Sequence, residues 1–234
     1  MKTPLRLALS TCAAWALFAT ADIANAQDPT VTVDPAYLNL GYMNWFNLPS
    51  AGGAYAGGSS WGIPDLTASF TSTTLTLGPN HIGDMNSYWY TPMGQPGATG
   101  NKVMDANLYN ETTGTYVGTT LTFTGNVLSD TLVGQTAPNG VTWSSVAFIK
   151  DFVANYSSSV SVTAPLVNGV FNIGLLTSSD PTHHIQYGFE TIGSDVWVTD
   201  IGQYGTVVIQ VPEPSTLAFL GLGALGALAW RRRR

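Results

Sequence analysis

Residues 117–123 read Val117-Gly-Thr-Thr-Leu-Thr-Phe123. The odd-numbered positions carry Val, Thr, Leu and Phe, and small or polar residues stand between them. A period of two with one apolar face is typical of a half-buried β-strand. Apolar residues also occupy alternate positions in residues 104–108 and 185–189. The body of the chain is therefore predicted to be built from strands.

Further candidate strands are short segments rich in β-branched and aromatic residues. They are residues 37–45, 66–77, 87–90, 127–133, 142–149, 160–163, 170–176, 196–201 and 206–211. Turn signals separate them, and Pro138-Asn139-Gly140 and Asn168-Gly169 fit tight hairpin turns because Asn and Gly tolerate positive φ. The only helical signal in this region is a single turn at residues 151–156.

Many short strands separated by turns predict an all-β fold, an antiparallel β-sandwich or jelly roll. We expect one domain over residues 27–210, with a boundary near residues 134–139 as the alternative. Residues 50–60 are rich in Gly, Ala and Ser and are predicted to form a flexible surface loop.

The N-terminal stretch has the three parts of a secretory signal peptide. Lys2 and Arg6 precede a mostly apolar segment, and small residues follow at Ala24 and Ala26. This order predicts a signal peptide over residues 1–26, which a signal peptidase removes by cutting after Ala26.

The C-terminal stretch predicts a single short membrane helix over residues 216–230. Pro212, Glu213 and Pro214 precede it, and the two prolines cannot lie inside a helix. The apolar run is shorter than the roughly 20 residues of a comfortable membrane span. Four arginines follow it and predict a cytoplasmic end; they are Arg231, Arg232, Arg233 and Arg234.

The order Pro-Glu-Pro, apolar helix, arginine cluster resembles the PEP-CTERM sorting signal, here over residues 211–234. In that family a membrane-embedded exosortase processes the tail near Pro212, Glu213 and Pro214. The resemblance implies export across the inner membrane, transient anchoring, and release to the cell surface or the extracellular matrix. Such proteins are often associated with exopolysaccharide and biofilm. The tail is also labelled as the C-terminal part of ice-binding proteins, and that label describes sorting rather than ice binding.

The charge of the mature region excludes nucleic acid as a partner. Between the two processed ends there are two basic residues, Lys102 and Lys150, and twelve acidic residues, which gives a net charge of −10. Two lysines cannot form a basic patch. Cys12, the only cysteine, lies in the signal peptide. We therefore expect no disulfide, and a packed core must stabilise the domain.

No catalytic or metal-binding constellation stands out. The available carboxylates are Asp84, Asp105, Glu111, Glu190, Asp195 and Asp200, and their spacing selects no acid–base pair. His183 and His184 are expected on opposite faces of a strand, and His81 is alone. We expect no catalysis, no cofactor and no metal, with a structural calcium ion as a weak alternative.

Aromatic side chains are the best candidates for ligand binding, because exposed rings stack on the apolar faces of sugars. Tyr55 interrupts the glycine-rich stretch, and Trp61 follows it directly. Tyr88 and Tyr90 are predicted to share one strand face, with Trp89 on the other. The competing interpretation is that most of these rings are core.

Residues 145–197 loosely resemble the second half of carbohydrate-binding jelly rolls, in which a Tyr-Gly-Phe strand precedes a Trp-bearing strand. Here these are residues 187–189 and Trp197. The favoured hypothesis is a non-catalytic surface or matrix protein that binds exopolysaccharide. The alternatives are a self-associating structural protein without a small ligand, and a secreted glycan hydrolase.

Overall fold

The computed structural model describes residues 28–213. The predicted signal peptide with Ala24 and Ala26, the predicted membrane helix over residues 216–230, and Pro214 with the four arginines lie outside the described residues. Within residues 28–213, no helix has the length and apolar character needed to cross a bilayer.

Two six-stranded sheets form the body. Sheet A consists of β1 (Thr30–Val31), β4 (Ala68–Phe70), β5 (Thr74–Leu77), β9 (Thr120–Asp130), β12 (Gly169–Leu176) and β14 (Val207–Gln210). Sheet B consists of β2 (Leu40–Asn47), β3 (Tyr55–Ser60), β8 (Lys102–Thr113), β10 (Ser144–Phe152), β11 (Ser159–Pro165) and β13 (His184–Ser194). The remaining elements are short: β6 (Tyr90–Thr91), β7 (Thr99–Gly100), and the 3-10 turns η1 (Pro49–Ala51), η2 (Ile63–Leu66) and η3 (Ile201–Gln203).

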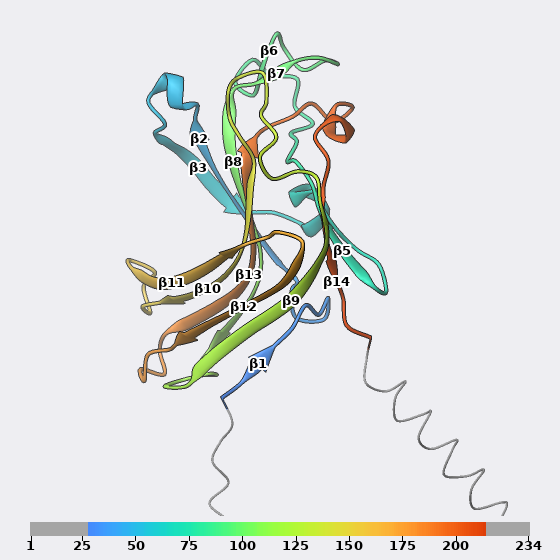
Figure 1. Ribbon diagram of the computed structural model, residues 1–234. Helices are drawn as coiled ribbons and strands as arrows, with labels where there is room; N and C mark the ends of the chain where they lie inside the picture. The colour runs from blue at the N-terminus through green and yellow to red at the C-terminus, as the bar shows by residue number, and fades with distance from the viewer. Residues whose placement is uncertain (1–27, 214–234) are drawn as a thin grey trace, which may run out of the picture.

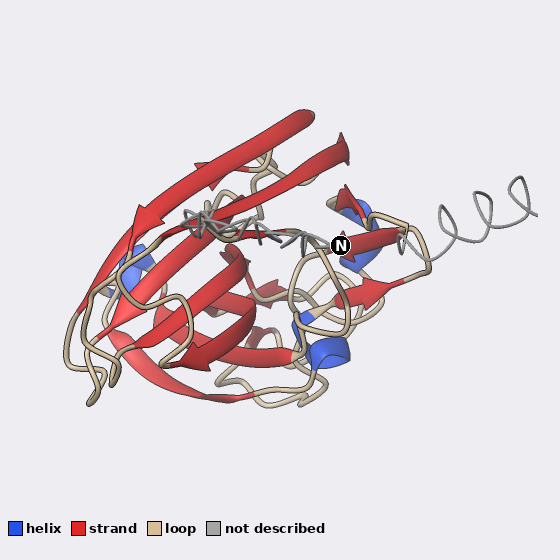
Figure 2. Ribbon diagram, turned by 90° about the horizontal axis from the view of Figure 1, so that it is seen from below, coloured by secondary structure: helices blue, strands red, loops and turns tan. Residues whose placement is uncertain are grey.

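The strand order agrees with the predicted sandwich. Sheet B runs β11-β10-β13-β8-β2-β3, and sheet A runs β12-β9-β14-β5-β4 with β1 also beside β9. All neighbours are antiparallel except β1 and β9. From β8 onward the chain changes sheet at every connection except β10 to β11, which is the connectivity typical of a jelly roll. Figure 2 shows the layers of strands from one end.

The predicted alternation places the core between the sheets. Leu121 and Phe123 of β9 are fully buried, as are Met104 of β8 and Ile185 of β13. The Phe123 ring lies 5.3 Å from the Tyr187 ring on the opposite sheet. The period-two prediction is therefore confirmed for these three strands, and their alternate residues point out of the sandwich.

Two glycine-containing segments were predicted wrongly. Residues 55–60 form β3 instead of a loop, and Gly57 allows this because a Cβ there would run into the Trp45 indole. Asn168-Gly169 is no hairpin turn, since it joins β11 to β12 on the other sheet. The predicted turn at residues 138–140 is confirmed: Thr136 pairs with Thr142, and Gly140 has a φ of 85°.

Two predicted strands are also wrong. Residues 87–90 form a turn that leads into β6, and residues 196–201 form turns that lead into η3. The aromatic residues in both segments explain their strand-like composition. They pack against each other outside any long strand, with the Tyr90 and Trp197 rings 5.4 Å apart.

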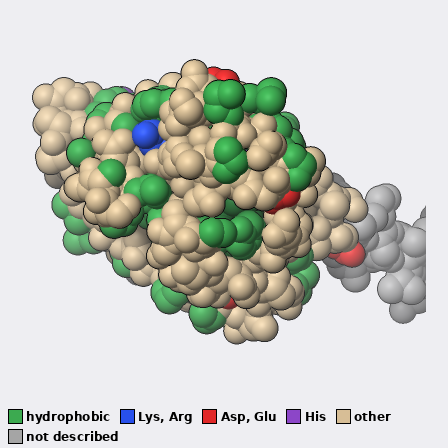
Figure 3. Space-filling model, turned by 90° about the horizontal axis from the view of Figure 1, so that it is seen from above, with side chains coloured by type: hydrophobic (Ala, Val, Ile, Leu, Met, Phe, Trp, Pro, Cys, Tyr) green, Lys and Arg blue, Asp and Glu red, His purple; other side chains and the backbone are tan. Residues whose placement is uncertain are grey.

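The last strand occupies the middle of sheet A. β14 pairs with β5 on one side and β9 on the other. Val211 then donates its N–H to the Thr73 carbonyl, and its side chain is 5% exposed. The described chain ends at the same end of the molecule as it begins (Figure 1). Seen from the opposite end, the surface shows few charged side chains (Figure 3).

Candidate functional site

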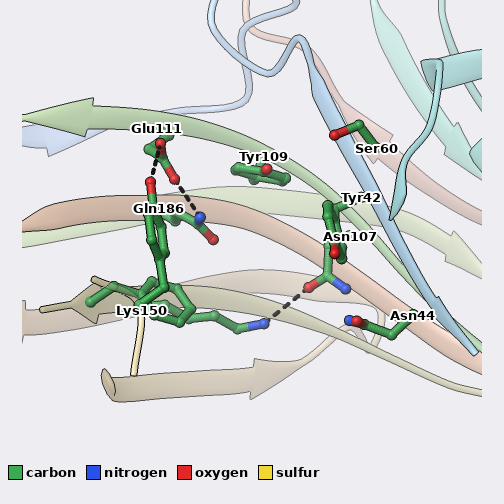
Figure 4. Close-up of a pocket in the computed structure, with 10 residues that line it drawn as sticks. Tyr42, Asn44, Ser60, Asn107, Tyr109, Glu111, Lys150 and Gln186 are labelled. Carbon is green, nitrogen blue, oxygen red and sulfur yellow. Dashed lines mark hydrogen bonds between the residues drawn. The ribbon is translucent and has the colours of Figure 1, made fainter. Parts of the chain in front are cut away.

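A groove of about 550 Å³ lies on the outer face of sheet B. Its lining combines aromatic rings, side-chain amides and a few charged groups (Figure 4). The lining residues are Tyr42, Asn44, Ser60, Asn107, Tyr109, Glu111, Lys150, Phe152, Tyr156 and Gln186. Its volume falls within the range of small-molecule sites, roughly 300–1,000 Å³.

The alternation that builds the core also builds the groove. On β8, Met104 and Leu108 face the core, so Asn107, Tyr109 and Glu111 face outward. β8 pairs with β2 and β13, and β13 pairs with β10. Four adjacent strands of sheet B therefore present their outward residues on one surface, and β3 closes one edge.

Hydrogen bonds orient the amides at one part of the groove. Asn44 and Asn107 each donate an amide N–H to Asp105, at 3.1 and 2.7 Å. The Lys150 ammonium donates to the Asn107 side-chain oxygen at 2.9 Å and to Glu190 at 2.7 Å. The bond from Lys150 to Asn107 is drawn in Figure 4. Asn107 is thus held on both sides, whereas no hydrogen bond from residues 28–213 reaches the side-chain oxygen of Asn44.

The carboxyl group of Asp105 has a raised pKa. Burial, together with the nearby Glu190, raises the pKa of its carboxyl to about 6. Lys150 and the two amide donors, Asn44 and Asn107, partly offset this rise. Asp105 is therefore ionised at neutral pH, when it can accept both amide hydrogen bonds.

A second set of bonds holds the part of the groove near Glu111. Gln186 donates to one oxygen of Glu111 at 2.6 Å, and the Tyr156 hydroxyl donates to the other at 2.9 Å. The Tyr156 ring stacks on His184, with centroids 4.3 Å apart and planes at 6°. Burial and the contact with Glu111 raise the pKa of Tyr156 to about 12, so the phenol stays a donor. The ring is thereby fixed at the groove although its residue is 48% exposed.

This combination of groups suits a sugar. Rings of Tyr42, Tyr109, Phe152 and Tyr156 offer flat apolar surfaces. Amide and hydroxyl groups beside them can donate and accept hydrogen bonds, which is what a sugar hydroxyl requires. Sequence reasoning missed these residues except Glu111. They could have been identified as the polar and aromatic residues that stand between the alternating core residues of β8 and β13.

Tyr88, Trp89 and Tyr90, which were predicted to bind a ligand, are not part of the groove lining, and the strand faces predicted for them are wrong. Tyr90 is 0% exposed, and its hydroxyl bonds the backbone of Ile82 and Val196. Tyr88 is 44% exposed and covers the Lys102 ammonium, which lies 4.0 Å from its ring centroid. Trp89 is half-buried.

Tyr55 and Trp61 lie closer to the groove. A Cβ built at Gly58 would lie 2.7 Å from the Tyr55 hydroxyl and 2.8 Å from the Asn44 side-chain oxygen. Both groups therefore lie over Gly58 of β3. Trp61 and Trp89 line a second hollow of about 420 Å³, which also includes Ser60 of the groove.

The histidines bind different partners. His183 Nδ1 lies 2.6 Å from the Asp151 carboxylate, whereas His184 Nδ1 lies 2.7 Å from the Thr113 hydroxyl. Within residues 28–213, no group of three or more His, Cys, Asp or Glu side chains could hold a metal ion.

The candidate carboxylates separate into two groups. Asp105, Glu111 and Glu190 lie at the groove, although their sequence spacing selected no pair. Asp195 is 1% exposed, and Asp200 accepts the Gly97 N–H at 2.7 Å. Asp84 is exposed and accepts the backbone N–H of Asn86.

Comparison with known proteins concerns the end of the chain. The family model for the PEP-CTERM protein-sorting motif matches residues 210–234. The chain carries a PEP-CTERM sorting motif. This motif marks an exported protein that an exosortase processes, as the sequence predicted. No curated protein and no solved structure matches the chain.

The PEP-CTERM motif begins inside the folded domain. Gln210 is both the last residue of β14 and the first residue of the matched segment. Pro212 and Glu213 follow directly and are exposed. No linker therefore separates strand β14 from Pro212 and Glu213.

Proposed function

We propose that the exported protein binds exopolysaccharide through the groove on sheet B, without catalysis. The observation that carries this proposal is the outward row of Asn107, Tyr109 and Glu111 on the central strand β8. The row places an aromatic ring between two polar groups, with further amides on β2 and β13. Such a surface combines stacking area with oriented hydrogen-bond partners. Export through the PEP-CTERM pathway delivers it to the place where exopolysaccharide is found.

The state of the groove carboxylates supports binding rather than hydrolysis. A glycosidase needs two carboxyl groups that flank the glycosidic bond, one as the general acid and one as the nucleophile or base. Here both oxygens of Glu111 accept hydrogen bonds, from Gln186 and Tyr156. Asp105 is held by two amides and Glu190 by Lys150.

Replacement of Tyr109 tests the proposal. We expect Tyr109→Ala to weaken binding of host exopolysaccharide by tenfold or more, because a central aromatic contact typically contributes about 2 kcal/mol and about 1.4 kcal/mol corresponds to tenfold. Calorimetric titration of residues 27–213 measures it.

Tyr37→Ala is the matched control, since Tyr37 is 58% exposed and lies outside the groove lining. The proposal is wrong if no host polymer binds, or if both variants bind like the parent protein. Steady release of reducing ends would instead favour the hydrolase.

Self-association is the second candidate function, and the edge of the sandwich favours it. β11 and β12 each pair with a single strand and form adjacent edges of the two sheets. Val160, Val170 and Leu176 on them are 64%, 77% and 71% exposed. Exposed edges with apolar side chains promote strand pairing between molecules. Concentration-dependent sedimentation without sugar, abolished by Val170→Lys, would support this function.

A further inference from the structure

The groove and the second hollow meet at one residue. Ser60, at the end of the edge strand β3, lines both. Beyond it, the hollow is formed by Trp61, Gly62, Asp65, His81, Ile82, Gly83 and Trp89. The path from the groove therefore continues over the sheet edge to a second surface that has aromatic rings of its own.

In the second hollow, hydrogen bonds hold the indole ring of Trp61 in a fixed position. The Trp61 Nε1–H donates to the Ser59 hydroxyl at 2.9 Å, and the backbone N–H of Trp61 donates to the Gly41 carbonyl at 3.0 Å. Trp61 is half-buried, and the adjacent Gly62 leaves no side chain beside it. A ring that is fixed before binding loses little entropy when a ligand stacks on it.

The charges along both hollows disfavour an anion. Among the described residues, Lys150 is the only cationic side chain that lines the groove, and its ammonium is already paired with Glu190. Asp65 and Glu111 add carboxylates to the lining. Burial lowers the pKa of His81, so that imidazole contributes no positive charge near neutral pH. An acidic polysaccharide would meet uncompensated negative charge in both places.

We propose that the two hollows are consecutive subsites of one track, which binds an uncharged polysaccharide chain passing over Ser60. This inference rests on the proposed glycan-binding function. It adds that the ligand is uncharged and that it binds as an extended chain. Two subsites on one chain act as linked binding sites, so affinity rises with chain length until both are filled.

A chain-length series tests the track. A neutral glucan and its di- to hexasaccharides are titrated into residues 27–213, with a polyuronate of similar length as the anionic probe. We expect the longest neutral chains to bind about tenfold tighter than the shortest, and the polyuronate to bind at least tenfold more weakly than the neutral glucan.

Two variants separate the subsites. Trp61→Ala removes the second ring, and Ser60→Arg places a long side chain at the exposed junction without removing a core residue. Both should abolish the gain with chain length, and Trp61→Ala, which lies outside the groove lining, should also leave disaccharide binding unchanged, whereas Tyr109→Ala should weaken binding at every length.

The possible negative results lead to different conclusions. Length-independent binding, or a polyuronate that binds as tightly as the glucan, would overturn the track and leave the groove as a binding site. Absence of binding by every neutral and anionic chain would overturn the proposed function together with the track.

Discussion

A chain that ends at Gly205 should fail to fold, while a chain that ends at Val211 should fold like the full domain. The missing strand β14 lies between β5 and β9, so its loss divides sheet A into two parts. It also removes three core side chains: Val207 and Ile209 are 0% exposed and Val211 is 5% exposed.

The expected loss is comparable to the stability of the whole domain. Burial of one aliphatic side chain contributes about 1.5–3 kcal/mol. Three of them amount to roughly 5–9 kcal/mol, against a typical stability of about 5–15 kcal/mol. The lost strand pairing and the opened core add to this.

Thermal unfolding of residues 27–205 and 27–211, followed by near-ultraviolet circular dichroism, measures the effect. The longer chain should unfold cooperatively and the shorter one should show no transition. A cooperative transition in both would contradict the assignment of β14 as a central strand.

The position of β14 also limits where the exosortase can cut. Val211 still donates a backbone hydrogen bond to Thr73, so only cleavage after Val211 leaves the fold intact. The mass of the released protein should therefore include Val211. A mature C-terminus before Val207 would be incompatible with this sandwich.

The domain should lose stability as the pH rises from about 4 to about 7. The main cause is Asp195, which is 1% exposed and whose Oδ2 has no hydrogen-bond partner within residues 28–213. Burial raises the pKa of its carboxyl from 3.8 to about 7, although the Lys102 N–H, bonded to Oδ1, partly offsets the rise.

The sign follows from proton linkage. Between these two pKa values the folded state holds a proton that the unfolded state has released, so folding is favoured at low pH. Stabilisation is complete below about pH 4 and is lost as the pH passes about 7. At about 1.36 kcal/mol per pKa unit, the full shift corresponds to roughly 4 kcal/mol. Asp105, whose pKa is raised to about 6, acts in the same direction.

Chemical denaturation between pH 4 and pH 8 checks this expectation. Asp195→Asn should flatten the profile and make the domain more stable than the parent protein at pH 8. Asp84→Asn is the control, because Asp84 is exposed and its replacement should leave the slope unchanged. An Asp195→Asn profile as steep as that of the parent protein would show that Asp195 is not the titrating group.

Alternating sequence was enough to predict the strands that carry the core. β8, β9 and β13 are long, and the inward residues at 104–108, 121–123 and 185–189 are apolar, so a period of two identifies these strands. β3 escaped prediction because its glycines look like a loop. Gly57 is required instead by the indole of Trp45 on the neighbouring strand, and a Cβ at Gly58 would run into the Tyr55 hydroxyl and the Asn44 side chain.

The groove could be predicted only in part. Each outward residue is visible in the sequence, but no local pattern says that β8 lies between β2 and β13. The hydrogen bond from Asn44 on β2 to Asp105 on β8 depends on the register of these two strands. The strand prediction for residues 88–90 failed for another reason: their aromatic residues, which are typical of strands, pack together in a turn. The sorting motif was predicted correctly because its parts are contiguous in sequence.

The most direct test of the glycan-binding groove is a map of amide chemical-shift changes in residues 27–213 during titration with a neutral gluco-oligosaccharide. We expect the largest changes on β2, β8, β10 and β13, centred on Asn44, Tyr109 and Gln186. Changes confined to sheet A, or to the edge formed by β11 and β12, would contradict the proposal that the outer face of sheet B is the binding site.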